Sequence, residues 1–236
     1  MLKRLSQFLS GCRWLYHMHA YNNTHPDELW VARLSFSQFG EDLLLDNLFA
    51  RNGVERGFYV EVGAYDPFMY SNTYFFYKKG WRGVLVEPNP TAYKRLCELR
   101  ARDTVVNTAI SSSAGVLPFV VDKACSGVLD ENYAFRNREN KEVIDVPCRP
   151  LADVLGQYAA DVPIAFLSVD CEGHDLAVLK SNDWSRFRPR VVIAEDHEPR
   201  YDGPIHEYMV SQGYVYLCKL GPSVVFREQA FVLKVH

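Results

Sequence analysis

Residues 58–68 read FYVEVGAYDPF, and this stretch decides the fold. Its first five residues, rich in apolar and β-branched side chains, predict a buried strand, and Gly63 opens a turn directly after it. Nucleotide-binding folds place a phosphate loop at such a turn, but a pyrophosphate loop needs several glycines and this turn offers one. Asp66 would also repel a pyrophosphate. The turn therefore indicates a ligand that carries positive charge.

Outward from this stretch, strands and helices alternate along the chain. Predicted helices cover residues 37–51, 71–80, 91–101, 151–158, 174–181 and 204–212, with Ser37 and either Ser71 or Asn72 as the first two N-caps. Predicted strands cover residues 58–62, 83–87, 104–110, 116–121, 142–148, 164–170 and 190–195. The chain closes on two apolar runs, 213–220 and 229–235, with no helix between them. This order predicts an α/β protein with a mostly parallel sheet covered on both faces and an antiparallel last strand.

Composition narrows the class of protein. The 236 residues are 48% hydrophobic, which is enough for one well-packed domain. A net charge of −3 argues against non-specific nucleic-acid binding. The six cysteines form no CxxC pair, so we expect reduced thiols, no zinc knuckle and a cytoplasmic protein. No apolar run approaches the roughly 20 residues of a membrane span.

The N-terminus differs from the rest of the chain. Residues 1–35 combine basic residues with an apolar-aromatic stripe and lack the continuous apolar core of a secretory signal. We expect a helical extension that packs on the domain or on a second subunit, with anchoring at a membrane surface as the weaker alternative. Residues 36–236 form the main domain.

Acidic and amide side chains recur at the predicted carboxyl ends of the strands. Open α/β sheets bind their ligands at this edge, near the switch in strand order. The strand ends carry Glu61, Glu87, Asn107, Asp170 and Glu195. Apolar strands bury such groups only where they are paired or serve a ligand. We therefore expect several strand ends to meet around one ligand site.

Glu87 lies at the end of the strand that follows Glu61. A carboxylate at this place can accept hydrogen bonds from both ribose hydroxyls of a nucleoside. Together with a turn that disfavours pyrophosphate, it indicates S-adenosylmethionine, whose ammonium and sulfonium groups prefer carboxylates. The alternative is that Glu61 and Asp66 only cap the following helix.

The chain carries five ordered motifs: SQFGEDLLL at 37–45, GFYVEVGAYDP at 57–67, SNTYFFYKKGWRGVLVEPNP at 71–90, NTAISSSAG at 107–115 and LSVDCEGHDLAVLKSNDW at 167–184. Together they resemble the FkbM-type family of S-adenosylmethionine-dependent methyltransferases, over about residues 35–220. The resemblance implies the class I methyltransferase fold, a Rossmann-like three-layer sandwich with a seven-stranded sheet whose last strand is antiparallel. It also implies methyl transfer to a hydroxyl of a sugar or natural-product-like small molecule.

The resemblance also assigns residues to the cofactor. Glu61, Gly63 and the turn to Asp66 are expected at its methionine end, Glu87 at the ribose, and residues 107–110 at the adenine. The full set expected at S-adenosylmethionine is Gln38, Glu61, Gly63, Ala64, Tyr65, Asp66, Ser71, Asn72, Thr73, Glu87, Pro88, Asn89, Asn107, Ala109 and Asp170.

Methyl transfer to a hydroxyl needs the acceptor oxygen held about 3 Å from the methyl carbon and its proton removed. His174 is the candidate base and Asp170 the second catalytic candidate; the alternative is that His174 is an exposed first-turn histidine. Asp170, Glu195 and Asp196 form a candidate site for Mg²⁺, Mn²⁺ or Ca²⁺, which would orient and acidify the hydroxyl. The alternative is that Glu195 or Asp196 pairs with Arg200.

Two other functions stay open at this point. An oxidoreductase that uses a nicotinamide dinucleotide would share the fold, although the missing GxGxxG weighs against it. A non-catalytic module would bind the cofactor without turnover. The expected partner is a small-molecule or saccharide acceptor with a free hydroxyl, and a homo-oligomer is open.

Overall fold

The computed structural model describes residues 33–129, 141–198 and 202–231. Contacts divide the chain into residues 1–34 and residues 35–236. The helical extension predicted for residues 1–35 falls almost wholly outside the described residues, and so does Arg200. None of the described helices is long and apolar enough to span a bilayer.

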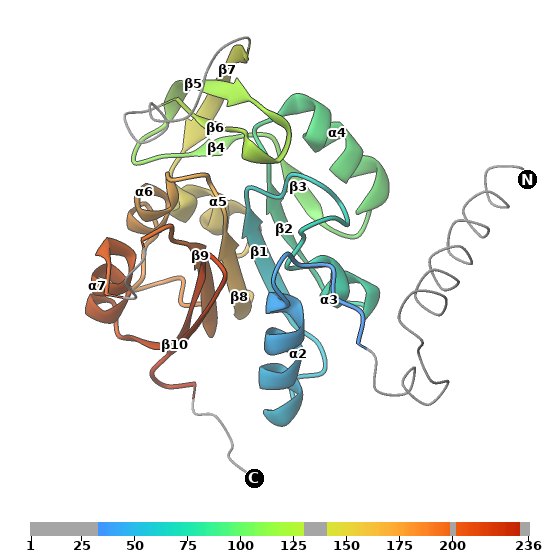
Figure 1. Cartoon of the computed structure of the whole chain (residues 1–236), viewed down its shortest axis with the longest axis vertical. Coiled ribbons are helices and arrows are strands. Elements are labelled where there is room, and N and C mark those ends of the chain that lie inside the picture. Colours follow the sequence, from blue (N-terminus) through green and yellow to red (C-terminus); the bar gives the residue numbers. More distant parts are fainter. Residues whose placement is uncertain (1–32, 130–140, 199–201, 232–236) are drawn as a thin grey trace, which may run out of the picture. The chain divides into compact units, whose positions relative to one another are not determined.

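A seven-stranded sheet forms the centre of residues 35–236, in the order β10-β11-β9-β8-β1-β2-β3 (Figure 1). Its strands are β1 (Phe58–Val62), β2 (Arg82–Val86), β3 (Thr104–Val106), β8 (Ile164–Val169), β9 (Val191–Glu195), β10 (Tyr214–Leu220) and β11 (Ser223–Glu228). The strands from β3 to β9 pair in parallel, whereas β11 is antiparallel to both β9 and β10. The predicted mostly parallel sheet with an antiparallel last strand is confirmed.

The described helices cover both faces of this sheet. Helices α2 (Glu41–Arg51), α3 (Tyr74–Lys78) and α4 (Pro90–Leu99) pack on one face, and α5 (Leu151–Tyr158), α6 (Asp175–Lys180) and α7 (Pro204–Ser211) pack on the other. Val60 and Val62 join the core beneath α5, α6 and α7, while Tyr59 joins the core beneath α2, α3 and α4. This alternation arises because successive side chains of a strand point to opposite faces.

A second sheet, in the order β4-β7-β5-β6, interrupts the alternation. It consists of β4 (Ala109–Ile110), β5 (Gly115–Val121), β6 (Gly127–Val128) and β7 (Glu142–Arg149), and Figure 1 draws it above the large sheet. Phe119, Val128 and Val146 form its own small core. A short 3-10 helix, η2 (Lys123–Cys125), connects β5 to β6.

Two predicted strands were placed wrongly. The strand predicted for 104–110 breaks after Val106, because the side-chain amide of Asn107 turns to donate to the carbonyls of Glu87 and Pro88. The last strand is SVVFRE at 223–228 rather than QAFVLKV at 229–235. The turn at Gly221 and Pro222 places Ser223 opposite Glu195, so the apolar run VVF is the one that pairs with β9.

The N-caps of α2 and α3 also differ from the predicted ones. Helix α2 begins at Glu41 and its N-cap is Gly40, with φ of 86°, instead of Ser37. The hydroxyl of Ser37 instead hydrogen-bonds the backbone and the carboxylate of Asp42. Helix α3 takes Thr73 as its N-cap, although the Ser71 hydroxyl still accepts from the backbone N–H of Tyr74 at 3.1 Å.

Candidate active site

A cavity of about 340 Å³ lies at the carboxyl ends of β1, β2, β8 and β9. The strand order reverses between β1 and β8, which is where an open α/β sheet binds its ligand. Residues of η2 and β6 line the side of the cavity formed by the small sheet. Of the residues predicted from the sequence, those that line the cavity are Gln38, Gly63, Ala64, Tyr65, Glu87, Pro88, Ala109, Asp170, His174 and Glu195.

Gly63 brings β1 and β8 into contact at the base of the cavity. Its backbone is left-handed, with φ of 83°, and a Cβ at this position would lie 1.8 Å from the carbonyl oxygen of Asp170. The backbone N–H of Asp170 in turn donates to the carbonyl of Val62 at 3.0 Å. Only glycine satisfies both demands without displacing one of the two chains.

Glu87 connects the turns that follow β1 and β2. Its carboxylate accepts hydrogen bonds from the backbone N–H of Tyr65 at 2.8 Å and from that of Asn89 at 2.7 Å. Burial raises the pKa of Glu87 to about 7, and the charge of Glu61 adds to the effect. Glu87 therefore shapes the cavity wall while still lining it.

Glu61 lies behind the cavity wall instead of lining it. It is buried, and its carboxylate accepts from the Thr73 hydroxyl at 2.6 Å, from the Asn72 backbone N–H at 3.0 Å and, at longer range, from Ser71. Burial raises the pKa of Glu61. The side-chain amide of Asn72 donates to Ser168 of β8 at 2.9 Å. The structure thus brings four predicted residues, Glu61, Ser71, Asn72 and Thr73, into contact with one another, but behind the cavity wall and not in its lining.

Three further predicted residues support turns beside the cavity. Asp66 accepts from the backbone N–H groups of Phe68 and Met69 and forms an ion pair with Arg95 at 2.7 Å. Asn89 is the N-cap of α4, where its side chain accepts from two backbone N–H groups of the first turn. Asn107 holds the carbonyls after β2, as described above.

Asp170 faces the cavity at the end of β8, and its side chain is accessible from it. The protein packed around it nevertheless makes ionisation costly, and this burial raises the pKa of Asp170 to about 8. The nearby charges of Asp175 and Glu172 act in the same direction, whereas a hydrogen bond with Glu195 opposes it. His174, the N-cap of α6, lines the same cavity.

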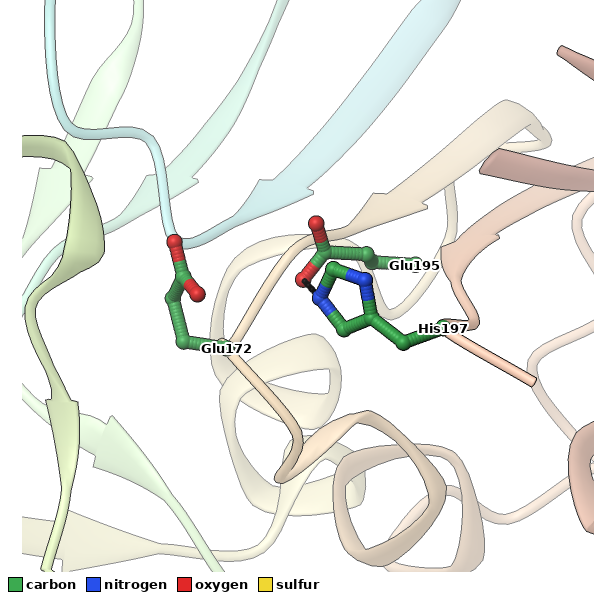
Figure 2. Close-up of side chains that lie close together, drawn as sticks. All are labelled: Glu172, Glu195 and His197. Carbon is green, nitrogen blue, oxygen red and sulfur yellow. Dashed lines mark ion pairs between the residues drawn. The ribbon is translucent and has the colours of Figure 1, made fainter. Parts of the chain in front are cut away.

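A second group of ligating side chains lies beside Asp170. Figure 2 shows Glu172, from the loop after β8, facing Glu195 and His197 at the end of β9. One ligand atom from each lies within 4.8 Å of the others, and His197 Nε2 is 3.1 Å from Glu195 Oε2. Asp196 is turned elsewhere: it is buried, and its carboxylate accepts from the backbone N–H of Glu198 at 2.9 Å.

The sequence interpretation missed several residues of the cavity wall. Glu172 and His197 lie two positions after Asp170 and Glu195, which were predicted. The acids at the ends of these two strands were therefore the signal that could have pointed to them. Tyr65, Tyr70 and Glu172 are the non-glycine residues with positive φ in the described chain, and all three line the cavity. Such backbone strain concentrates at functional sites. The residues contributed by the small sheet, such as Phe119 and Cys125, had no signal because its position over the cavity is a tertiary feature.

The cavity is strongly acidic. Glu87, Asp170, Glu172 and Glu195 line it, and no lysine or arginine is among the described residues that do. A concave site that is lined by carboxylates and by no lysine or arginine of the described residues attracts a cationic ligand. This charge pattern fits the ammonium and sulfonium of S-adenosylmethionine, a divalent cation, or both.

A comparison with known protein families identifies the family of this chain. The profile of the methyltransferase FkbM domain matches residues 61–216. No curated protein matches the chain.

Three solved structures are similar in part. The METTL16 methyltransferase domain has 12% sequence identity and a TM-score of 0.46; the match covers 79% of this chain and 65% of that one. A methyltransferase from Geobacter sulfurreducens has 15% identity and a TM-score of 0.42, covering 95% and 97%. The 1,6-didemethyltoxoflavin-N1-methyltransferase of Burkholderia thailandensis, bound to 1,6-didemethyltoxoflavin and S-adenosylhomocysteine, has 8% identity and a TM-score of 0.40, covering 94% and 89%.

Proposed function

This chain belongs to the methyltransferase FkbM domain family, and from that premise we propose that it methylates a hydroxyl of a small-molecule or saccharide acceptor. The family and the class I arrangement of the sheet make it an S-adenosylmethionine-dependent methyltransferase. The observation that carries the proposal is the cavity at the strand-order switch, whose charged lining residues are carboxylates apart from histidine. S-adenosylmethionine, when bound, supplies the electrophilic methyl group.

The residues that would hold the cofactor follow from the cavity wall. Glu87 uses each carboxylate oxygen for one backbone N–H, and the remaining lone pairs are available to ribose hydroxyls. The turn from Gly63 to Tyr65 lets the methionine end approach the backbone closely. Pro88 and Ala109 offer apolar surface for the adenine.

Asp170 and His174 are the candidate proton acceptors. S-adenosylmethionine, when bound, would supply the methyl group, and one of these side chains would take the proton that the acceptor hydroxyl gives up. A base works best when its pKa lies near the working pH. Both side chains line the cavity, and the pKa of Asp170 is raised toward this range, so we propose that one of the two is the base and the other orients the hydroxyl.

We propose further that Glu172, Glu195 and His197 bind a divalent cation. Three ligand atoms that lie within 4.8 Å of one another come from two strand ends and face one another across the cavity edge (Figure 2). Carboxylates suit Mg²⁺, Mn²⁺ and Ca²⁺, and the imidazole nitrogen shifts the preference to Mn²⁺. A cation here would lower the pKa of the acceptor hydroxyl.

The cofactor assignment is tested by isothermal titration calorimetry with S-adenosylhomocysteine and, separately, with NAD. We expect S-adenosylhomocysteine to bind and NAD to give no heat; the reverse result makes the chain an oxidoreductase. Incubation with methyl-deuterated S-adenosylmethionine and a panel of monosaccharides, nucleotide sugars and phenols follows. Mass spectrometry and NMR should locate the label on oxygen. Label on nitrogen or carbon contradicts the hydroxyl assignment.

The cation is tested by titrating the protein with Mn²⁺ alone and following free Mn²⁺ by electron paramagnetic resonance. Glu172→Gln and His197→Ala should abolish a site that the wild type retains. Glu198→Gln is the matched control, because it removes an exposed carboxylate from the same loop but outside the cluster. Equal binding by all four proteins, or none by the wild type, removes the cation from the mechanism.

A further inference from the structure

Arg100 is a fully buried arginine that does not line the cavity. It follows α4 as its C-cap residue, and its side chain is 0% exposed. Its guanidinium pairs with Asp103 at 2.9 Å and packs over the ring of Tyr77 at 4.7 Å. A buried charge is costly unless it is paired and hydrogen-bonded, so the partners of the remaining donors are informative.

Those remaining donors reach the segment that forms one wall of the cavity. Arg100 Nη1 donates to the carbonyl oxygen of Pro67 at 3.0 Å, and Nη2 donates to Thr73 Oγ1 at 2.8 Å and to Tyr59 OH at 3.2 Å. Residues 64–73 are therefore tied to an arginine outside the cavity at two points. The planar fork of the guanidinium fixes the spacing between these points in a way that a lysine ammonium does not.

One of these points lies between the two strained residues of the segment, and the other follows them. Tyr65 and Tyr70 have φ of 42° and 62°, and both line the cavity. Pro67 lies between them, and Thr73 follows the second. Backbone strain of this kind persists only where the surrounding structure holds it. The Arg100 contacts contribute to that restraint from behind the wall, in addition to the hydrogen bonds of this segment to Glu87 and Asp66.

The same contacts connect Arg100 to Glu61. Thr73 Oγ1 accepts from Arg100 and donates to the Glu61 carboxylate at 2.6 Å, so one hydroxyl bridges the two charges. The charge of Arg100 lowers the cost of an ionised Glu61, which burial otherwise raises. Glu61, Thr73 and Arg100 form one hydrogen-bonded chain from β1 through the segment to the end of α4.

We infer that Arg100 is a positioning residue for the cofactor: it holds residues 64–73, and with them Tyr65 and Tyr70, in the shape that binds S-adenosylmethionine. The identity of the ligand in this inference rests on the proposed function. The restraint of residues 64–73 by Arg100 does not, because these contacts are present without a ligand.

The test compares the wild type with Arg100→Lys and Tyr59→Phe by three measurements. Calorimetry with S-adenosylhomocysteine gives the affinity, hydrogen–deuterium exchange gives the protection of residues 64–73, and the melting temperature gives the stability. Arg100→Lys keeps the charge and loses the fork. Tyr59→Phe removes a hydroxyl that accepts from Arg100 at 3.2 Å and donates to Asp103 at 2.8 Å, so it loosens the guanidinium without removing it. We expect the same changes as in Arg100→Lys but smaller, and this variant decides the matter if Arg100→Lys does not fold.

Tyr214→Phe is the matched control. Tyr214 is also buried, and its hydroxyl donates to the carbonyl of Pro189 at 2.7 Å, but it is not among the residues that line the cavity. It reports what the loss of a buried tyrosine hydroxyl does to the fold alone. We expect its melting temperature to fall while its affinity and the exchange of residues 64–73 stay as in the wild type.

For Arg100→Lys we expect the dissociation constant of S-adenosylhomocysteine to rise about tenfold, since hydrogen bonds to charged groups are at stake. Exchange should accelerate in residues 64–73 and stay unchanged in β8 and β9. Variants that lose thermal stability but keep wild-type affinity and exchange show a merely structural arginine and overturn the inference. If the wild type binds no S-adenosylhomocysteine, the proposed function fails, and the exchange result alone decides whether Arg100 positions the segment.

Discussion

Gly63 shows how one residue can carry two constraints. It needs a left-handed backbone, and it needs space beside the Asp170 carbonyl. Gly80 is subject to the first constraint alone. It has a similar φ of 89°, yet nothing lies within 4 Å of the position that its Cβ would occupy.

The pair gives a prediction for alanine substitutions. Gly80→Ala should cost about 1–2 kcal/mol, the strain of a left-handed alanine, and leave affinity for S-adenosylhomocysteine unchanged. Gly63→Ala should cost clearly more and abolish binding, because the methyl group forces β1 and β8 apart. Chemical denaturation and calorimetry measure both effects. Similar losses in the two variants would show that conformation, not close approach, explains Gly63.

Glu87 is the second residue whose role is testable by itself. Glu87→Ala removes the acceptor of the Tyr65 and Asn89 backbone N–H groups and the proposed ribose partner. We expect binding of S-adenosylhomocysteine to weaken by about 1–3 kcal/mol, and Glu87→Gln, which keeps one acceptor oxygen, to weaken it less. Calorimetry on the three proteins checks the order. Unchanged affinity in Glu87→Ala contradicts the ribose assignment.

At the scale of elements, the turn that precedes α2 illustrates what local patterns leave out. Asp42 is buried and accepts from the Ser35 hydroxyl at 2.6 Å, from the Phe36 backbone N–H at 2.7 Å and from the Ser37 hydroxyl at 2.9 Å. These bonds hold residues 35–37 outside the helix. They also place Gln38 at the cavity, which is why the helix starts later than its apolar spacing suggests.

Asp42→Asn should therefore destabilise the turn and weaken cofactor binding. The amide replaces one acceptor oxygen by a donor that faces other donors, at a cost of about 1–3 kcal/mol. Asp46→Asn is the control: the same change in the same helix removes only an exposed ion pair with Lys79, worth about 0.2–1 kcal/mol. Denaturation midpoints and S-adenosylhomocysteine affinity distinguish them. Equal effects would show that Asp42 does no more than a surface charge.

For the molecule as a whole, the acidic cavity makes stability depend on pH. Burial raises the pKa of Glu87 to about 7 and that of Asp170 to about 8, so the folded protein holds protons that the unfolded chain has released. Where the folded state binds more protons, stability falls as pH rises. The effect spans the interval from the ordinary carboxylate pKa values up to the raised ones.

We expect the melting temperature of the ligand-free protein to fall between about pH 5 and pH 8, measured by circular dichroism in buffers of equal ionic strength. Asp170→Asn should flatten the upper part of this decline, because it removes the group with the pKa of about 8. A melting temperature that rises over this interval would contradict the protonation assigned to the folded state.

The alternation of strand and helix, the parallel sheet and most strand-end acids follow from the sequence. They are local: a short apolar run such as FYVEV, rich in β-branched and aromatic residues and followed by Gly63, favours a buried strand, and the carboxyl ends of parallel strands meet at one edge. The sequence placed the last strand at 229–235, whereas the structure has it at 223–228. Both runs are apolar, and pairing with β9 decides which of them forms the strand.

The sequence predicted the cofactor class, because the single-glycine turn and Glu87 lie in adjacent elements and the motifs around them resemble a methyltransferase family, whose profile matches residues 61–216. The division of labour among the acids was decided only by tertiary structure. Glu61 accepts a hydrogen bond from Thr73, which in turn accepts one from Arg100. Asp196 accepts from the backbone N–H of Glu198. Glu172 and His197 lie beside Glu195. A carboxylate's role depends on which donors surround it in space, and those donors come from segments that lie far apart along the chain.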